Sequence, residues 1–376
     1  MDVEIPTKEH KSQQLDQLQR SPSMSIMDGH HRTIHGKPFT VWTAMGIGHS
    51  ITNTAITLIV GLASGAALGG PPLFIYGFII MAIIAFAVAI SLGELASALP
   101  HSGGQYYCVA VLAPPSCRRF LSYVTGIVGS NHNPRRNIPQ ALLVTVALGT
   151  ATGFPIILAL FLSAPSVETI VNSATPSLQI FYDAFSQNTA AALGLQSIVL
   201  VSAAGAIIGI HTWQSRIAWA FSKDKAFPFH RFLSQIAPEP YGTPIYAHIW
   251  SCCWTAVLGC IYMGSQLAFN SLVSGGILLQ YIAYSTCIAC LLWHGRSKIT
   301  PGPFWFPKLG LVANIVVLVW TLIALVFYCF PSFIPVEADL MSYVSCVIVG
   351  VFLYALVYWV AFGRKEYQTP EPEQYD

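Results

Sequence analysis

The chain has 376 residues, of which 54% are apolar and only 9% are charged, and its mean hydropathy is +0.59. Soluble domains carry roughly 25% charged residues, so the composition argues against a water-soluble enzyme. The 18 Lys and Arg nearly balance the 16 Asp and Glu, and the formal net charge of +2 provides no global field that would attract nucleic acid. We therefore expect a membrane protein without a nucleic-acid partner.

Eight stretches reach the length of about 20 apolar residues that a helix needs to cross the hydrocarbon core of a bilayer. They are residues 41–62, 73–95, 139–162, 193–212, 244–263, 269–293, 309–330 and 341–362. A further apolar stretch, residues 120–129, is too short to span. The pattern predicts an all-α integral membrane protein with about eight transmembrane helices.

The charges of the loops support this count, because cytoplasmic loops carry an excess of Lys and Arg. With eight crossings and a cytoplasmic N-terminus, all 18 Lys and Arg fall on the inner side. The outer loops then carry only acidic residues, namely Glu168, Asp183, Glu337 and Asp339. Both termini are therefore predicted to be cytoplasmic.

The first predicted span is interrupted by Gly46, Gly48, His49 and Ser50. Broken helices in transporters expose backbone N–H and C=O groups near the middle of the membrane, where these groups bind substrate or a coupling ion. Close packing of helices through small residues is the alternative. We take these four residues as candidates for substrate binding.

Glu94 is the sole acidic residue in a predicted span, near the cytoplasmic end of the second one. A carboxylate in a membrane is costly unless it is paired or hydrated, so it is a functional candidate. Two roles remain open: a part in proton transfer or gating, or a structural pair with a loop arginine.

The chain contains no Walker loop, GxSxG or HExxH motif, so neither an enzyme nor a metal site is predicted.

Four segments together resemble one family. They are residues 91–100 running into 102–107, residues 133–139, residues 215–224 followed by Phe227 and Pro228, and Pro303 and Phe304 with Gly310 and Asn314. In this order they resemble the amino acid-polyamine-organocation superfamily, and more narrowly the fungal permeases for 4-aminobutyrate, other amino acids and choline.

The resemblance implies an inverted-repeat fold of twelve helices, with substrate held between the broken first and sixth helices. In this chain the third helix begins at residue 120 and stops near 129. The residues that follow resemble the loop that comes after the sixth helix of the family. The fold is therefore expected to be incomplete and to lack the third-to-sixth helix region. The resemblance assigns Gly46, Gly48, His49 and Ser50 to the broken first helix.

These observations give a domain plan. It consists of a polar cytoplasmic N-tail (1–40), two transmembrane helices with a truncated third (41–129), a cytoplasmic junction loop (130–138), six transmembrane helices (139–362) and a cytoplasmic C-tail (363–376).

By resemblance, the function is secondary active transport of amino acids or amines such as 4-aminobutyrate or choline, coupled to protons or Na⁺ and without a cofactor. The expected partners are this substrate, the lipid bilayer and a full-length permease, and the plasma membrane is favoured over the vacuolar membrane. The alternative is a truncated non-transporting isoform, a decayed copy or an incomplete gene model. Because the loss of four helices would expose small and polar helix faces, the 376-residue chain alone is expected to be poorly stable and to give no uptake above background.

Overall fold

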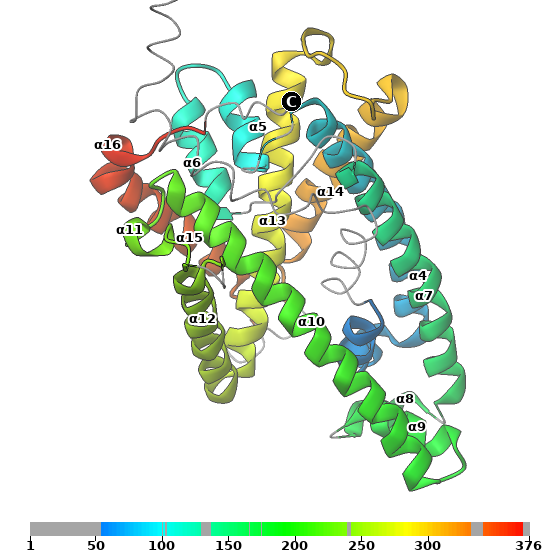
Figure 1. The fold of residues 1–376 in the computed structure, drawn as a ribbon. Coiled ribbons are helices and arrows are strands. Elements are labelled where there is room, and N and C mark those ends of the chain that lie inside the picture. Colours follow the sequence, from blue (N-terminus) through cyan, green and yellow to red (C-terminus); the bar gives the residue numbers. More distant parts are fainter. Residues whose placement is uncertain are drawn as a thin grey trace, which may run out of the picture. The chain divides into compact units, whose positions relative to one another are not determined.

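The structure, a computed structural model, describes residues 54–99, 101, 104–128, 137–164, 166–173, 175–238, 242–331 and 341–370. Over these ranges the secondary structure is helical, with no strand (Figure 1). The long helices are α4 (Thr54–Ala98), α7 (Asn137–Ser163), α10 (Thr189–Lys223), α12 (Ile245–Gly264), α13 (Gln266–His294), α14 (Pro307–Phe327) and α15 (Val344–Tyr358). The shorter ones are α5 (Gln105–Leu112), α6 (Arg118–Val128), α8 (Val167–Asn172), α9 (Pro176–Ala184), α11 (His230–Leu233), η1 (Arg296–Lys298), η3 (Trp359–Gly363) and α16 (Arg364–Glu366). The predicted all-α class is confirmed for the described residues.

Seven helices in the described ranges are long and apolar enough to cross a membrane, by length and composition. They are Gly69–Ala98, Pro139–Ser163, Thr189–Lys223, Ile245–Gly264, Gln266–His294, Pro307–Phe327 and Val344–Glu366. They correspond to the second through eighth predicted spans. Most of the first predicted span, residues 41–53, lies outside the described residues, and its remainder opens α4.

Helix α4 contains a sharp bend at Gly70, which has a φ of 65° and is followed by Pro71 and Pro72. Glycine tolerates this backbone conformation, and each proline removes a backbone donor, so the helix cannot continue straight. A side chain at Gly65 would overlap the ring of Phe74. Nine residues of straight helix span roughly 13 Å, so this contact requires α4 to bend between Gly65 and Phe74.

Helix α6 covers the apolar stretch that the sequence identified as too short to span. It has 11 residues and contacts α5 and α13. No part of it belongs to the seven candidate spans. The prediction that this stretch does not cross the membrane stays a prediction, because the residues that follow Val128 lie outside the described ranges.

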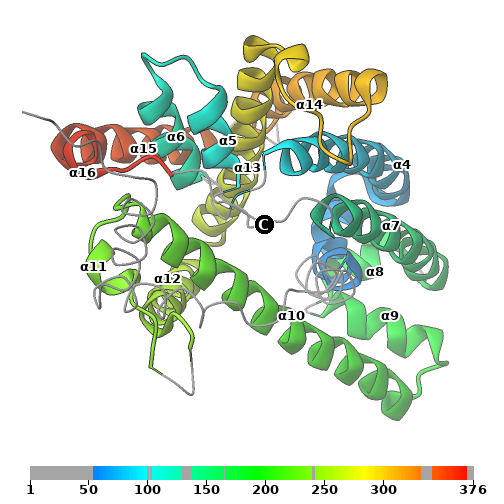
Figure 2. The ribbon, with the colours of Figure 1, turned by 45° about the horizontal axis from the view of Figure 1, so that its top comes forward.

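The buried core lies between helices that are distant in sequence. Helix α4 packs against α7 and α14, α13 packs against α5, α14 and α15, and α10 packs against α12 and α9 (Figures 1 and 2). Val109, Cys287, Leu291 and Val317 are fully buried at the centre of one cluster, which joins α4, α5, α13 and α14. These contacts hold the end of α4 that carries Glu94.

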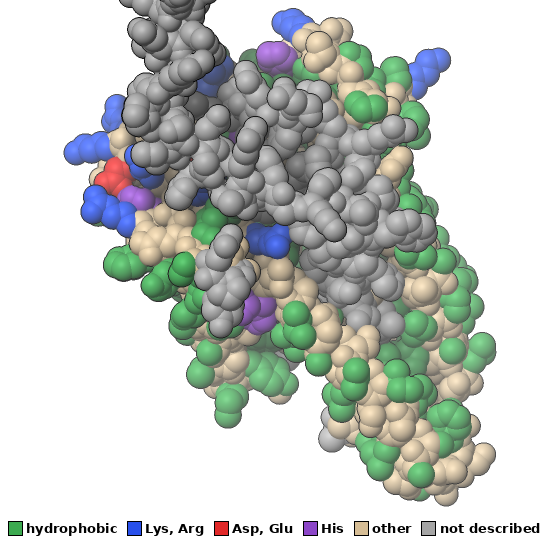
Figure 3. Space-filling model, in the orientation of Figure 1, with side chains coloured by type: hydrophobic (Ala, Val, Ile, Leu, Met, Phe, Trp, Pro, Cys, Tyr) green, Lys and Arg blue, Asp and Glu red, His purple; other side chains and the backbone are tan. Residues whose placement is uncertain are grey.

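Helix α10, like α12, leaves most of its apolar surface bare. Ala206 is the one buried residue between 193 and 212, whereas Ile198, Val201 and Ile208 are 65%, 73% and 70% exposed. In Figure 3, hydrophobic side chains are frequent over the lower parts of α10 and α12, whereas Lys and Arg lie in the upper half of the view. A surface of this kind suits contact with lipid or with further apolar helices.

Candidate functional site

The predicted site residues fall in two places. Gly46, Gly48, His49 and Ser50 lie outside the described residues. Glu94 lies near the end of α4 and has no exposed surface. The site that the structure describes is therefore built around Glu94.

The Glu94 carboxylate is held by three donors. Arg296, in η1, donates from Nη1 to Glu94 Oε2 at 2.8 Å and from Nη2 to Oε1 at 3.2 Å. The backbone N–H of Phe306 donates to Oε1 at 2.7 Å. A paired guanidinium and carboxylate is the strong, directional form of an ion pair, and here the arginine side chain is only 13% exposed.

Asn314, in α14, extends this arrangement and is fully buried. With its amide oxygen facing Arg296, the oxygen accepts from Nη1 at 2.7 Å, and the nitrogen donates to Ser91 Oγ and to the Gly310 carbonyl. Only this orientation gives both ends of the amide a complementary partner. Asn314 therefore connects the arginine to both helices.

Two glycines allow the chain segments to approach this closely. A side chain at Gly310 would overlap the Glu94 carboxylate, and one at Gly302 would overlap the backbone of Ser97. Ser97 Oγ also accepts from the Phe304 N–H at 2.9 Å. The loop between η1 and α14 is thus bonded to the last turn of α4.

The same loop covers the arginine with an aromatic ring. The Arg296 guanidinium lies 4.5 Å from the centre of the Trp305 ring, which shields the ion pair from water and adds a cation–π contact. We call the residues that make these contacts the Glu94 cluster: Ser91, Glu94, Arg296, Gly310 and Asn314.

The Glu94 cluster ties the end of α4 to the beginning of α14. The cost of burying a carboxylate is offset by the arginine and by the hydrogen bonds that satisfy the remaining oxygen sites. In the structure Glu94 pairs with Arg296, which lies in the loop between α13 and α14. The role of Glu94 in proton transfer or gating stays a prediction.

A second polar cluster joins α10 to α12. His211 Nδ1 lies 3.1 Å from Ser251 Oγ, which donates to Gln214 Oε1 at 2.7 Å. The ring of His248 lies 5.8 Å from that of His211. These residues were not predicted from the sequence; the only signal there is polar side chains within two apolar stretches.

A third cluster fixes the segment that follows α16. The Tyr367 hydroxyl lies 2.7 Å from Ser122 Oγ, and Arg119 Nη2 donates to the Tyr367 carbonyl at 2.6 Å. Burial raises the pKa of the Tyr367 phenol above its ordinary value of 10.0, so the hydroxyl stays neutral. This cluster ties the end of the last helix to α6.

The seven long apolar helices of the described ranges, with an ion pair buried at the end of one of them, are those of an integral, multi-pass membrane protein. The model of the amino acid permease family matches residues 120–353, which is more than half of the chain. The chain belongs to this family.

Several of its relatives are fungal transporters. Transmembrane transporter swnT of Metarhizium robertsii and swainsonine transporter swnT of Arthroderma benhamiae are each 32% identical, over 89% of this chain and 93% of their own length. The choline transporter of Saccharomyces cerevisiae is 28% identical over 90% of this chain and 84% of its own length. The resemblance found in the sequence is thereby confirmed.

These alignments also show that the chain is shorter than its relatives internally. The Metarhizium alignment runs over 465 positions, whereas 89% of a 376-residue chain is about 335 residues. About 130 aligned positions therefore have no counterpart in this chain. This agrees with an incomplete permease fold, and the location of the gap between Gly129 and Asn133 stays a prediction.

Proposed function

We propose that this protein is a secondary active permease for amino acids or related amines, such as 4-aminobutyrate or choline. The observation that carries the proposal is the alignment with named transporters over nine-tenths of the chain. Protons or Na⁺ are the proposed coupling ions, and transport rather than catalysis is the proposed activity. We place the protein in the plasma membrane rather than the vacuolar membrane.

Transport is proposed to need the helix region that this chain lacks. About 130 positions of the relatives have no counterpart, and by resemblance the third and sixth helices, which border the substrate site, are among them. The 376-residue chain is therefore expected to transport only when that region is supplied, either by a longer form of the same protein or by a full-length permease partner.

A second candidate function is a non-transporting form. The bare apolar surface of α10 favours it, because a helix that lacks its neighbours is available for pairing with another membrane protein. A truncated isoform and a decayed copy would both behave in this way. An incomplete gene model would instead leave the permease proposal intact.

Uptake in a permease-deficient yeast strain separates these candidates. Three forms are compared with labelled choline, 4-aminobutyrate and a neutral amino acid: the 376-residue chain, the full-length choline transporter, and a completed chain. The completed chain carries the corresponding segment of that transporter between Gly129 and Asn133. We expect saturable uptake by the completed chain and none above the vector control by the 376-residue chain.

The opposite results have distinct meanings. A completed chain that reaches the membrane at normal levels but takes up none of the three substrates would contradict the permease proposal and favour the non-transporting form. Sequencing of full-length transcripts across the codons for residues 126–136 then identifies an incomplete gene model. A message that encodes about four more helices, each about 20 residues long, would establish one.

A further inference from the structure

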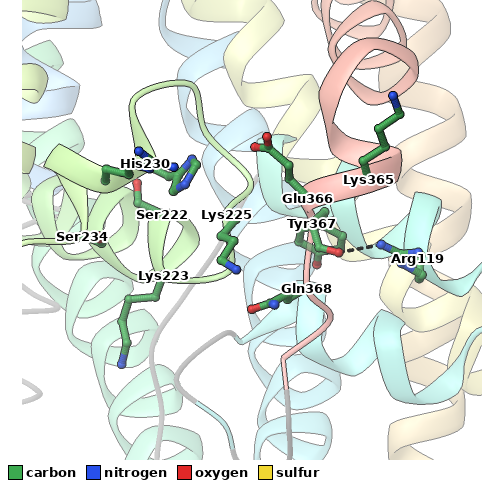
Figure 4. Close-up of a pocket in the computed structure, with 11 residues that line it drawn as sticks. Arg119, Ser222, Lys223, Lys225, His230, Ser234, Lys365, Glu366, Tyr367 and Gln368 are labelled. Carbon is green, nitrogen blue, oxygen red and sulfur yellow. Dashed lines mark hydrogen bonds between the residues drawn. The ribbon is translucent and has the colours of Figure 1, made fainter.

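A basic cavity lies where the ends of two candidate spans meet. It has a volume of about 620 Å³ and is lined by residues from α6, from the end of α10 through α11, and from α16 onward (Figure 4). Five of the lining side chains are Lys or Arg, and one is Glu: Arg119, Lys223, Lys225, Arg231, Lys365 and Glu366. The cavity therefore has an excess of positive charge, whereas the chain as a whole is nearly neutral.

The positive charges of the cavity are only partly compensated. Arg119 donates to the Tyr367 carbonyl, and Lys223 lies 4.8 Å from the centre of the Trp219 ring, so neither is paired with a carboxylate through these contacts. In the part of the chain that the structure describes, no ion pair is recorded for Lys225 or Arg231. Four of the five cations are exposed and Lys225 is half-buried, and like charges gathered at one site repel one another less when an anion binds between them.

The arrangement of the side chains leaves room for such an anion. Lys225 points toward Gln368 and the backbone beside Tyr367, while Arg119 approaches the same segment from the other side (Figure 4). His230 lines the cavity as a further nitrogen donor, whereas Lys365 points away from the other labelled residues. Lys223 also points away from the other labelled residues (Figure 4). Lys225 and Arg119 approach from different walls, and their N–H groups are donors of the kind that bind phosphate oxygens.

The cavity lies at the ends of two candidate membrane spans, which indicates where in the bilayer its ligand would be. The candidate spans Thr189–Lys223 and Val344–Glu366 both end at residues that line it. Phosphate-bearing lipid headgroups lie at this depth, and basic pockets beside the ends of membrane helices are suited to bind them.

We propose that this cavity binds a phosphate-bearing anion, either the phosphorylated headgroup of an inositol lipid or a soluble inositol phosphate. The two sources share the chemistry that the cavity recognises. The binding would fix the loop after α10 against the segment after α16, because both contribute donors to the same ligand. The inference does not depend on which substrate the permease carries.

The test uses the full 376-residue chain in a neutral detergent. Binding of dioctanoyl phosphatidylinositol 4,5-bisphosphate and of inositol 1,4,5-trisphosphate is measured by thermophoresis at physiological salt. The K225Q/R231Q variant removes two cations of the cavity, and K298Q/K308Q removes two exposed lysines elsewhere as a matched control. Each cation removed from the cavity is expected to weaken binding by about fivefold.

The expected result is binding by the native chain and by the control, with a loss of about 25-fold in K225Q/R231Q. Tighter binding of the lipid than of the trisphosphate identifies the lipid as the source, and equal binding identifies the soluble anion. Absence of binding by the native chain, or equal weakening in both double variants, would overturn the proposal. Melting temperatures with and without each ligand provide a second readout, since a ligand that binds the folded chain raises them.

Discussion

The Glu94 cluster and helix α10 are both parts of apolar helices, yet one is enclosed and the other is bare. Ser91, Glu94 and Asn314 have no exposed surface, and their polar atoms bond across two helices and a loop. On α10, by contrast, Ile198 and Ile208 are 65% and 70% exposed, and a side chain at Gly205 would meet nothing within 4 Å.

The difference shows which part of the permease fold is supported within this chain. Where α4 and α14 meet, Glu94 is bonded to Arg296 and Phe306, and the ion pair depends on how the two helices pack. Along α10, most apolar side chains are exposed, and about 130 positions of the relatives have no counterpart in this chain. We expect substitutions in the Glu94 cluster to be costly and equivalent substitutions on α10 to be nearly neutral for the chain alone.

The largest effect is expected from breaking the ion pair. E94Q and R296Q should each lower the free energy of unfolding by about 3–5 kcal/mol, because each leaves a buried charge without its partner. The measurement is thermal unfolding of the detergent-solubilised chain, followed by size-exclusion chromatography. The double variant should lose much less than the sum of the two single losses. Additive losses would show that the two side chains do not act as a pair.

A pair of glycine substitutions compares the two regions directly. G310A should destabilise the chain by about 1–3 kcal/mol, because the new methyl group would overlap the Glu94 carboxylate. G205A meets open space and should be neutral or stabilising by up to about 1 kcal/mol, because alanine favours a helix over glycine. Equal effects of the two variants in the same unfolding assay would contradict the comparison.

A smaller effect is expected where α10 does have a partner. S251A removes the hydroxyl that bonds both His211 and Gln214, and should cost about 1 kcal/mol. S197A is the control, because the exposed Ser197 hydroxyl bonds only the carbonyl of Leu193 in its own helix, and it should change stability by less than about 0.5 kcal/mol. Equal losses in the two variants would mean that the α10–α12 bonds do not stabilise the pair.

The helical spans could be predicted from the sequence because their signal is local. About 20 apolar residues in a row are sufficient to indicate a span, and the ten-residue stretch at 120–129 could be set apart by its length alone. The bend in α4 was harder to predict from the sequence. It depends on the contact between Gly65 and Phe74 as well as on Gly70 and the two prolines that follow it.

The site could be predicted only in part. Glu94 was identifiable because it is the acidic residue within a predicted span, but its partner Arg296 lies 202 residues away and is one of many loop cations. Asn314 belonged to a recognised segment, yet its bond to Arg296 depends on how α14 packs against α4. The pairing of His211 with Ser251 depends in the same way on the packing of α10 against α12.

The most direct test of whether the 376-residue chain transports alone is uptake by the purified chain in lipid vesicles with an imposed proton or Na⁺ gradient. Labelled choline, 4-aminobutyrate and a neutral amino acid are each supplied over a range of concentrations, and chromatography before reconstitution confirms that the chain is folded. We predict uptake equal to that of empty vesicles, because about 130 positions of the relatives have no counterpart in this chain. Saturable, gradient-dependent uptake of any of the three substrates would contradict it.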